Sequence, residues 1–78
     1  MDEQIESLDL RGLKCPLPAL FARRALVRAD RGARIEVIAD DPLAAIDVPH
    51  MCVQEGYEVL STSRSGSTVR MVLLKPSG

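Results

Sequence analysis

The pattern of hydrophobic and polar residues divides the chain into six short segments. Four of them, residues 6–10, 34–39, 57–63 and 68–74, alternate apolar and polar positions over a few residues. Such alternation is typical of strands with one buried and one solvated face, so the chain is predicted to contain four strands. The sequence RSGS at residues 64–67 separates the last two strands and predicts a hairpin.

Two helices are predicted between these strands. The first covers residues 16–29, with alanines and larger apolar residues along one arc and three arginines largely opposite. The second covers residues 42–55 and starts at the sequence DDP, with Asp41 as the N-cap and Pro42 as the first helical residue. Pro49 falls inside this helix, where it removes a backbone hydrogen bond, so we expect a kink or two shorter pieces.

The predicted elements follow the order strand, helix, strand, helix, strand, strand. Parallel strands need a crossover connection such as a helix, whereas the last two strands are close enough in sequence for an antiparallel hairpin. Since one face of the sheet is expected to be wet, both helices should cover the other face. The predicted fold class is therefore α/β, of the α+β type: a two-layer sandwich with a mixed four-stranded sheet and two helices on one face.

Length and composition fit one small globular domain, because apolar residues make up 46% and charged residues 27% of the 78 positions. A net charge of −1 and the scarcity of aromatic residues argue against direct binding of nucleic acid. No apolar run approaches the roughly 20 residues of a membrane span. The acidic start lacks the basic region of a secretion signal. We therefore expect a cytoplasmic monomer of one domain, residues 1–78, that does not contact a membrane.

Cys15 is the strongest candidate for chemistry, because it precedes the first predicted helix in the segment GLKCPLP. At the N-cap or first helical position it would lie beside free N–H groups, which stabilise an anion. Arg11 and Lys14 would add positive charge, so we expect a thiol pKa within the roughly 3.5–7.5 of activated cysteines. Pro16 and Pro18 would stiffen the first turn without losing a helical hydrogen bond. A lone cysteine is also commonly a small buried hydrophobe, and from the residues alone both interpretations stay open.

The other polar or reactive residues favour structural roles. Cys52 is predicted to pack in the core rather than to act as a resolving thiol, and His50 has no second histidine with which to share a metal ion. The cysteines form no CxxC pair, so neither a metal site nor, in a reducing compartment, a disulfide is expected. Asp9 is expected to bond the loop before Gly12, and Gly12 to adopt a backbone angle that other residues disfavour.

A resemblance to the TusA/SirA family of small sulfur-carrier proteins is carried by three segments, LDLRGLKCPLPALFARRAL, ADDPLAAIDVPHMC and GYEVLS, and spans about residues 8–74. The family pattern is an aspartate, a glycine and Cys-Pro-x-Pro at a helix start, followed later by DDP and D-[IV]-P. The matching residues are Asp9, Gly12, Cys15, Pro16 and Pro18, then Asp40, Asp41, Pro42, Asp47, Val48 and Pro49. A bare CPxP would be weak evidence, whereas both segments in this order and at this distance are specific.

The resemblance implies a sulfurtransferase that carries sulfur as a persulfide on Cys15. A donor protein such as a cysteine desulfurase would supply the sulfur and a second protein would accept it, with no cofactor and no metal. One branch of the family feeds tRNA thiolation, and others resemble partners in sulfur oxidation. The residues expected to shape the site are Gly12, Pro16, Pro18, Arg11 and Lys14.

Two other functions stay open at this point. One is a non-catalytic binding or regulatory module, because such sandwiches also resemble the RNA-binding C-terminal domain of translation initiation factor 3. The other is a thiol redox sensor, which would need Cys52 as a resolving cysteine close by.

Two groups of side chains on or just before the first helix are either ordinary surface residues or part of a docking site for a partner. Arg23, Arg24 and Arg28 form a basic stripe that is either simply solvated or meets an acidic partner. Three leucines, Leu13, Leu17 and Leu20, either pack against the first loop or lie exposed beside the cysteine.

Overall fold

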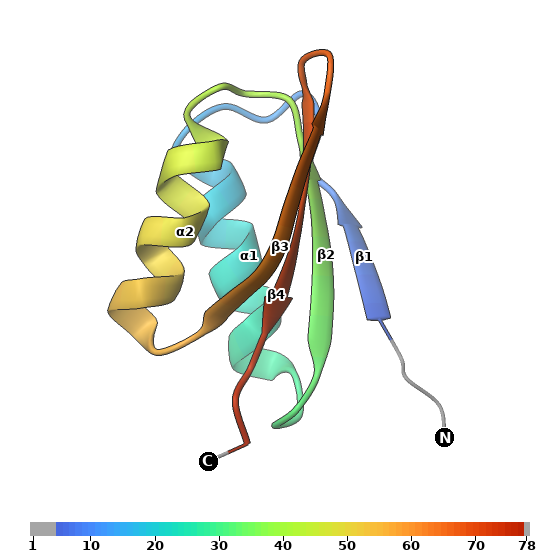
Figure 1. The fold of residues 1–78 in the computed structure, drawn as a ribbon. Helices are drawn as coiled ribbons and strands as arrows, with labels where there is room; N and C mark the ends of the chain where they lie inside the picture. Colours follow the sequence, from blue (N-terminus) through green and yellow to red (C-terminus); the bar gives the residue numbers. More distant parts are fainter. Residues whose placement is uncertain (1–4, 78) are drawn as a thin grey trace.

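The structure, a computed structural model, describes residues 5–77 as a four-stranded sheet with two helices on one face (Figure 1). The elements in chain order are β1 Ile5–Asp9, α1 Leu17–Arg28, β2 Arg34–Ala39, α2 Ala44–Glu55, β3 Glu58–Ser65 and β4 Thr68–Leu74. Across the sheet the strand order is β1-β2-β4-β3; β1 and β2 are parallel and the other neighbours are antiparallel. The predicted order of elements and the two-layer sandwich are confirmed.

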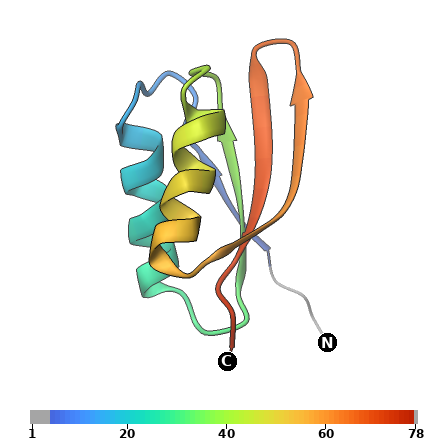
Figure 2. The same ribbon diagram turned by 60° about the vertical axis from the view of Figure 1, so that its left-hand side comes forward.

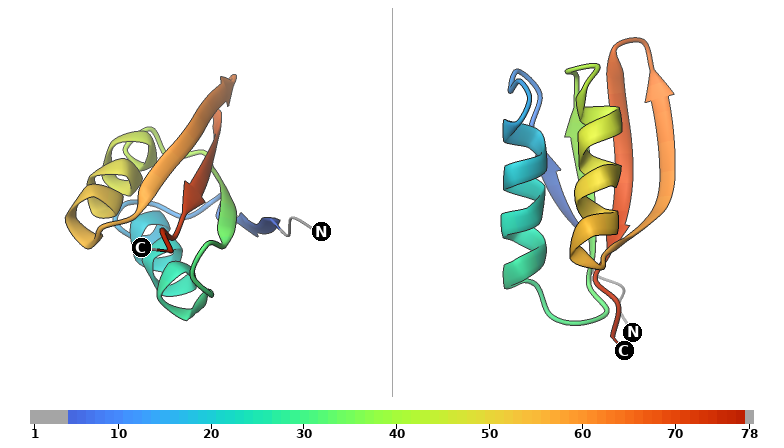
Figure 3. Two further views of the ribbon diagram at one scale, coloured as in Figure 1. Left: turned by 60° about the horizontal axis from the view of Figure 1, so that its bottom comes forward. Right: turned by 90° about the vertical axis from the view of Figure 1, so that its left-hand side faces the viewer.

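One apolar core fills the space between the two layers. Alternate residues of a strand point to the same face, and the central strands β2 and β4 direct their buried residues toward the helices. These residues are Ile35, Val37 and Ala39 of β2 and Val69, Met71 and Leu73 of β4. The helices contribute Ala22 and Leu26 from α1 and Val48 and Cys52 from α2, all fully buried. Figure 3 shows α1 and α2 side by side on this face of the sheet.

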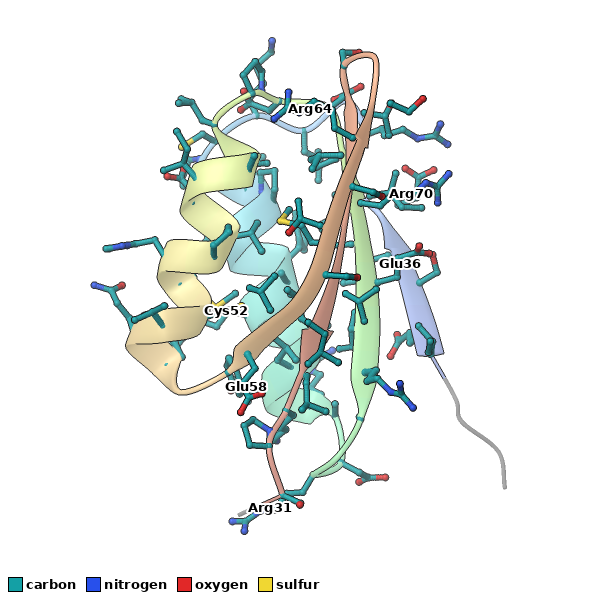
Figure 4. All side chains as sticks on the ribbon, viewed as in Figure 1. Arg31, Glu36, Cys52, Glu58, Arg64 and Arg70 are labelled. Carbon is teal, nitrogen blue, oxygen red and sulfur yellow. The ribbon has the colours of Figure 1, made fainter. Side chains whose placement is uncertain are left out.

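The other face of the sheet carries charged residues on its central strands, together with the apolar Ile38 of β2 and Val72 and Leu74 of β4. Glu36 of β2 and Arg70 of β4 point away from the helices (Figure 4) and form an ion pair of 3.6 Å. The hydroxyl of Ser7 on β1 donates to Glu36 at 3.3 Å. The alternation in the sequence therefore reflects a sheet with one face on the core and one in solvent.

The start of α2 differs from the prediction. The helix begins at Ala44 with Leu43 as its N-cap, so the assignment of Asp41 as the N-cap and Pro42 as the first helical residue is wrong. The helix also runs through Pro49 as one element rather than two pieces. Pro49 removes only one backbone hydrogen bond. Core residues on both sides of it, Val48 and Cys52, are fully buried, and this packing holds the helix together.

The observed ends of other helices and strands differ from the predicted ones by smaller amounts. β3 extends to Ser65, which pairs with Thr68, so the hairpin turn is two residues rather than four. Gly66 in this turn has φ of 61°, a conformation that suits tight hairpins and favours glycine. α1 begins at Leu17, one residue later than predicted.

The loops that precede the two helices meet at one end of the sandwich. The loop from β1 to α1 and the loop from β2 to α2 run beside each other there in two views (Figures 1 and 2). Leu10, buried just after β1, donates its N–H to the carbonyl of Ile38 at 2.7 Å and fixes the start of the first loop. Between residues 5 and 77, neither helix has the length and apolar character needed to cross a membrane.

Candidate functional site

Cys15 lies at the end of the first loop and is exposed. Pro16 is the N-cap of α1, so Cys15 stands one residue before the cap rather than at the predicted N-cap or first helical position. The Cys15–Pro16 peptide bond is cis. Pro18, in the first turn, is buried and anchors the helix start to the core. The N–H of Leu17, expected to be free, donates to the Lys14 carbonyl at 2.8 Å.

Gly12 and the residues before it fix the path of the loop. Gly12 has φ of 87°, as expected for a position that other residues disfavour. Its N–H donates to Oδ1 of Asp40 at 2.9 Å, which ties the first loop to the second. Asp9 accepts the N–H of Arg11 at 3.2 Å and binds its guanidinium through two hydrogen bonds of 2.8 and 2.7 Å. Asp9 therefore shapes the loop, as predicted.

Asp41 joins the cysteine to the start of the second helix. Its Oδ2 accepts the backbone N–H of Cys15 at 2.6 Å, and its Oδ1 accepts the N–H of Leu43 at 3.2 Å. The carboxylate that we expected to cap α2 thus bridges two loops that are 26 residues apart in sequence. This bridge holds the Cys15 backbone in place without using its side chain.

Asp47 contacts the sulfur itself. It lies in the first turn of α2, and its Oδ2 accepts a hydrogen bond from the thiol Sγ of Cys15. All three aspartates of the DDP and D-[IV]-P segments therefore face the cysteine loop. Neither Asp40 nor Asp47 has a local signal of its role in the sequence; each is marked only by its place in the family pattern beside a cysteine motif.

The immediate neighbours of the sulfur are acidic, and this overturns one expectation. The hydrogen bond to Asp47, and after it burial and the negative charges of Asp47 and Asp41, raise the pKa of the Cys15 thiol. No side chain caps α1, and Sγ forms its hydrogen bond with Asp47 instead of with an N–H group of the helix start. The prediction of a lowered pKa is therefore wrong, because the sulfur faces a carboxylate instead of the helix.

The two basic residues near the motif are directed to other partners. The guanidinium of Arg11 binds Asp9 and holds the pKa of that carboxyl at about 2. Asp41 has a lowered pKa, chiefly because of the N–H groups of Cys15 and Leu43, and the charge of Lys14 adds to the effect. The two positive charges of the first loop thus act on Asp9 and Asp41.

Comparison with known proteins identifies the family of this chain. The family described as sulfurtransferase TusA matches residues 6–75. The chain belongs to the TusA family. Two Neisseria meningitidis proteins, from serogroups A and B, are each 38% identical over 68 residues, which is 87% of this chain and 92% of theirs. Their names describe them as candidate sulfur carrier proteins.

A solved structure shares the fold of this TusA-family chain. The crystal structure of a SirA-like protein from Desulfitobacterium hafniense matches it with a TM-score of 0.79 and 20% sequence identity. The match covers 94% of this chain and 99% of that one. The resemblance inferred from the sequence motifs, and the fold class, are therefore confirmed.

The second cysteine of this TusA-family chain lies away from the surface. Cys52 is fully buried, as predicted, and burial raises the pKa of its thiol to about 11. Figure 4 shows it between α2 and the sheet. A resolving thiol must be reachable, so the packing of Cys52 disfavours a redox pair with Cys15. Across residues 5–77 no three His, Cys, Asp or Glu side chains are grouped to hold a metal ion.

We expect the two thiols to differ sharply in reactivity toward iodoacetamide. In the folded protein near neutral pH, Cys15 should be alkylated while Cys52 stays unmodified, because Cys52 is both inaccessible and held in the thiol form. Peptide mapping by mass spectrometry measures both sites in one sample. Unfolding in guanidinium chloride should expose Cys52 to alkylation. Equal labelling of both cysteines in the folded protein would contradict the buried position of Cys52.

Proposed function

We propose that this protein is a one-domain sulfur carrier that holds a persulfide on Cys15 and passes the sulfur from a donor protein to an acceptor protein. The observation that carries this proposal is the placement of Cys15: exposed, at one end of the sandwich, and fixed through its backbone by Asp41. Membership of the TusA sulfurtransferase family supports the same chemistry. The cytoplasm, where thiols stay reduced, is the proposed compartment.

The proposed reaction needs only one sulfur nucleophile. The Cys15 sulfur attacks the outer sulfur of a persulfide on the donor, a cysteine desulfurase or a similar protein. A bond forms between Sγ and the outer sulfur, the donor's S–S bond breaks, and the electron pair leaves on the donor's cysteine. An acceptor cysteine then attacks the outer sulfur on Cys15 in the same manner. The net change is transfer of one sulfur atom, without an external oxidant or reductant.

The surroundings of Cys15 suit a protein partner. The hollow beside its loop, lined by Gly12, Lys14 and Asp41 among others, measures about 280 Å³, which is below the roughly 300–1,000 Å³ of typical small-molecule pockets. Exposed apolar side chains lie nearby in sequence on both helices. They are Leu17 and Leu20 near the start of α1 and Leu43 and Ile46 at the start of α2. Brief docking of donor and acceptor could bury this apolar rim.

The basic stripe of α1, Arg23, Arg24 and Arg28, determines which charge we propose for the docking partner. Arg24 and Arg28 are exposed one turn apart, and Arg23, also exposed, pairs with Glu55 at 3.6 Å. We propose that the donor presents an acidic surface to α1 beside the apolar rim.

The variant Arg24→Glu should therefore slow loading from a cysteine desulfurase about tenfold, through a reversed charge at the docking surface. Loading from sodium tetrasulfide, which needs no docking, should stay unchanged. Both rates can be followed by intact-mass spectrometry. A matched reversal outside α1, Arg31→Glu in the turn after the far end of the helix, serves as the control. Equal loss in both variants, or a loss with tetrasulfide as well, would contradict docking on α1.

The relay itself is tested in two steps with radioactive sulfur. The protein is first incubated with a cysteine desulfurase and labelled cysteine, and then re-isolated and mixed with an unlabelled protein thiol. A carrier gains the label and gives it up to the second thiol. A protein that only binds partners gains no label, and a redox sensor instead forms a Cys15–Cys52 bond under peroxide.

A further inference from the structure

The contact between Cys15 and Asp47 joins two parts of the chain that the fold had to bring together. The thiol lies in the loop before α1, and the carboxylate comes from the first turn of α2, 32 residues later. Asp47 is half-buried, and Oδ2 accepts the S–H hydrogen bond. We propose that Asp47 is the proton acceptor and donor for Cys15 during sulfur transfer. This inference rests on the proposed function, because it assigns the proton of that reaction.

The neighbouring charged groups are placed for other tasks. Asp41 receives the N–H groups of Cys15 and Leu43, and Asp40 receives the N–H of Gly12. From the first loop, the charge of Lys14 acts on Asp41, and Arg11 is bound to Asp9. On α2, His50 follows Asp47 by about one turn and is exposed. The carboxylate of Asp47 is the group that the structure places on the reacting sulfur.

The proton would move in both directions during one cycle. During loading, Asp47 takes the proton of Cys15 as Sγ attacks the donor's outer sulfur. The donor's cysteine leaves with the electron pair and takes this proton from Asp47, which becomes a carboxylate again. During discharge, the acceptor's thiolate attacks the outer sulfur and the Sγ–S bond breaks. The electron pair then stays on Sγ, and Asp47, which has taken the proton of the acceptor's thiol, passes it to Sγ. Asp47 thus ends each cycle as the carboxylate that binds the thiol.

The same carboxylate would favour the form of the carrier that can give up its sulfur. A negative charge on Cys15 is disfavoured next to Asp47, as the raised pKa of the thiol shows. A persulfide in this place is therefore biased toward its neutral form. The outer sulfur of a neutral persulfide is open to attack by an acceptor thiolate, whereas an anionic one repels it.

The test compares wild-type protein with Asp47→Asn, which removes the charge and keeps the shape. The first measurement is the thiol pKa of Cys15, from the ultraviolet absorbance of the thiolate in a Cys52→Ala background. The second is the rate of loading by sodium tetrasulfide across about pH 5 to 9, which lies above the roughly 3.9 of an ordinary aspartate and includes the roughly 8.5 of an ordinary cysteine. Asp30→Asn is the matched control, because Asp30 follows the far end of the 12-residue helix α1 and loses the same charge.

We expect Asp47→Asn to make the thiol more acidic and yet slower to load. Near pH 6, loading of the variant should fall about 100-fold, at the low end for loss of a general base. Asp47→Glu, which keeps a carboxylate, should retain part of the rate, and Asp30→Asn all of it. Thermal unfolding of each variant shows whether it is folded.

Two results would overturn the proposal. Loading of Asp47→Asn at the wild-type rate or faster near pH 6 would mean that Asp47 only holds the thiol protonated. An unchanged thiol pKa in Asp47→Asn would mean that the two side chains do not share the proton. The titration does not depend on sulfur transfer. Failure of the wild-type protein to load sulfur would therefore contradict the proposed carrier function. The titration would still decide whether Asp47 holds the proton of Cys15.

Discussion

Replacement of Cys15 by serine should abolish sulfur loading from a cysteine desulfurase, to the detection limit of radioactive-sulfur transfer. The hydroxyl of serine can keep the hydrogen bond to Asp47, and the backbone N–H can still donate to Asp41. The site should therefore keep its shape while losing the atom that forms the S–S bond. A complete loss is expected because no other exposed thiol is present in the chain to take over.

The matched control for this experiment is Cys52→Ser or, to avoid a buried hydroxyl, Cys52→Ala. Cys52 is fully buried in the core between α2 and the sheet, so its removal should leave sulfur loading at the wild-type level. Cys52→Ala should lower only the free energy of unfolding, because a small cavity replaces the sulfur. Loading that persists in Cys15→Ser and disappears in Cys52→Ala would reverse the assignment of the carrier residue.

The largest effect on stability is expected for Leu26→Ala. Leu26 is fully buried where α1 packs on the sheet, and truncation of such a leucine typically costs about 2–5 kcal/mol. A domain of 78 residues has a free energy of unfolding of roughly 4–12 kcal/mol, so the loss is a large share of the total. Urea denaturation followed by circular dichroism measures the change.

Leu20→Ala is the control for this stability prediction, since it removes the same atoms from the same helix. Leu20 is 52% exposed, so its truncation should change the free energy of unfolding by only a few tenths of a kcal/mol. If Leu20 belongs to the docking rim, the variant should instead slow loading from the desulfurase. Similar destabilisation by both variants would contradict the observed orientation of α1.

Much of the fold could be predicted because its signals are local. Alternating residues such as Ile35, Glu36 and Val37 identify a strand with one buried face, and Gly12 marks a loop position with positive φ. The crossover rule and the short link between the last strands then restrict the topology to a two-layer sandwich. Pro16 and Pro18 indicated in the same way that a helix starts just after Cys15, whereas the exposure of the thiol stayed open from the residues alone.

The electrostatics of the site could not be predicted, because they depend on contacts between distant segments. DDP has the local signal of a helix N-cap, and the capping rule assigned Asp41 to α2. In the structure the same carboxylate reaches Cys15, which lies 26 residues earlier. Asp47 gave no local signal at all, since only the packing of α2 beside the first loop places it on the sulfur. These two contacts turn a predicted thiolate into a hydrogen-bonded thiol.

The most direct test of the carrier function is the mass of the wild-type protein after incubation with a cysteine desulfurase and cysteine. We predict a gain equal to one sulfur atom, located by peptide mapping on the segment that contains Cys15 and removed by dithiothreitol. No gain in mass, or a sulfur located on Cys52, would contradict the proposal that Cys15 carries the persulfide.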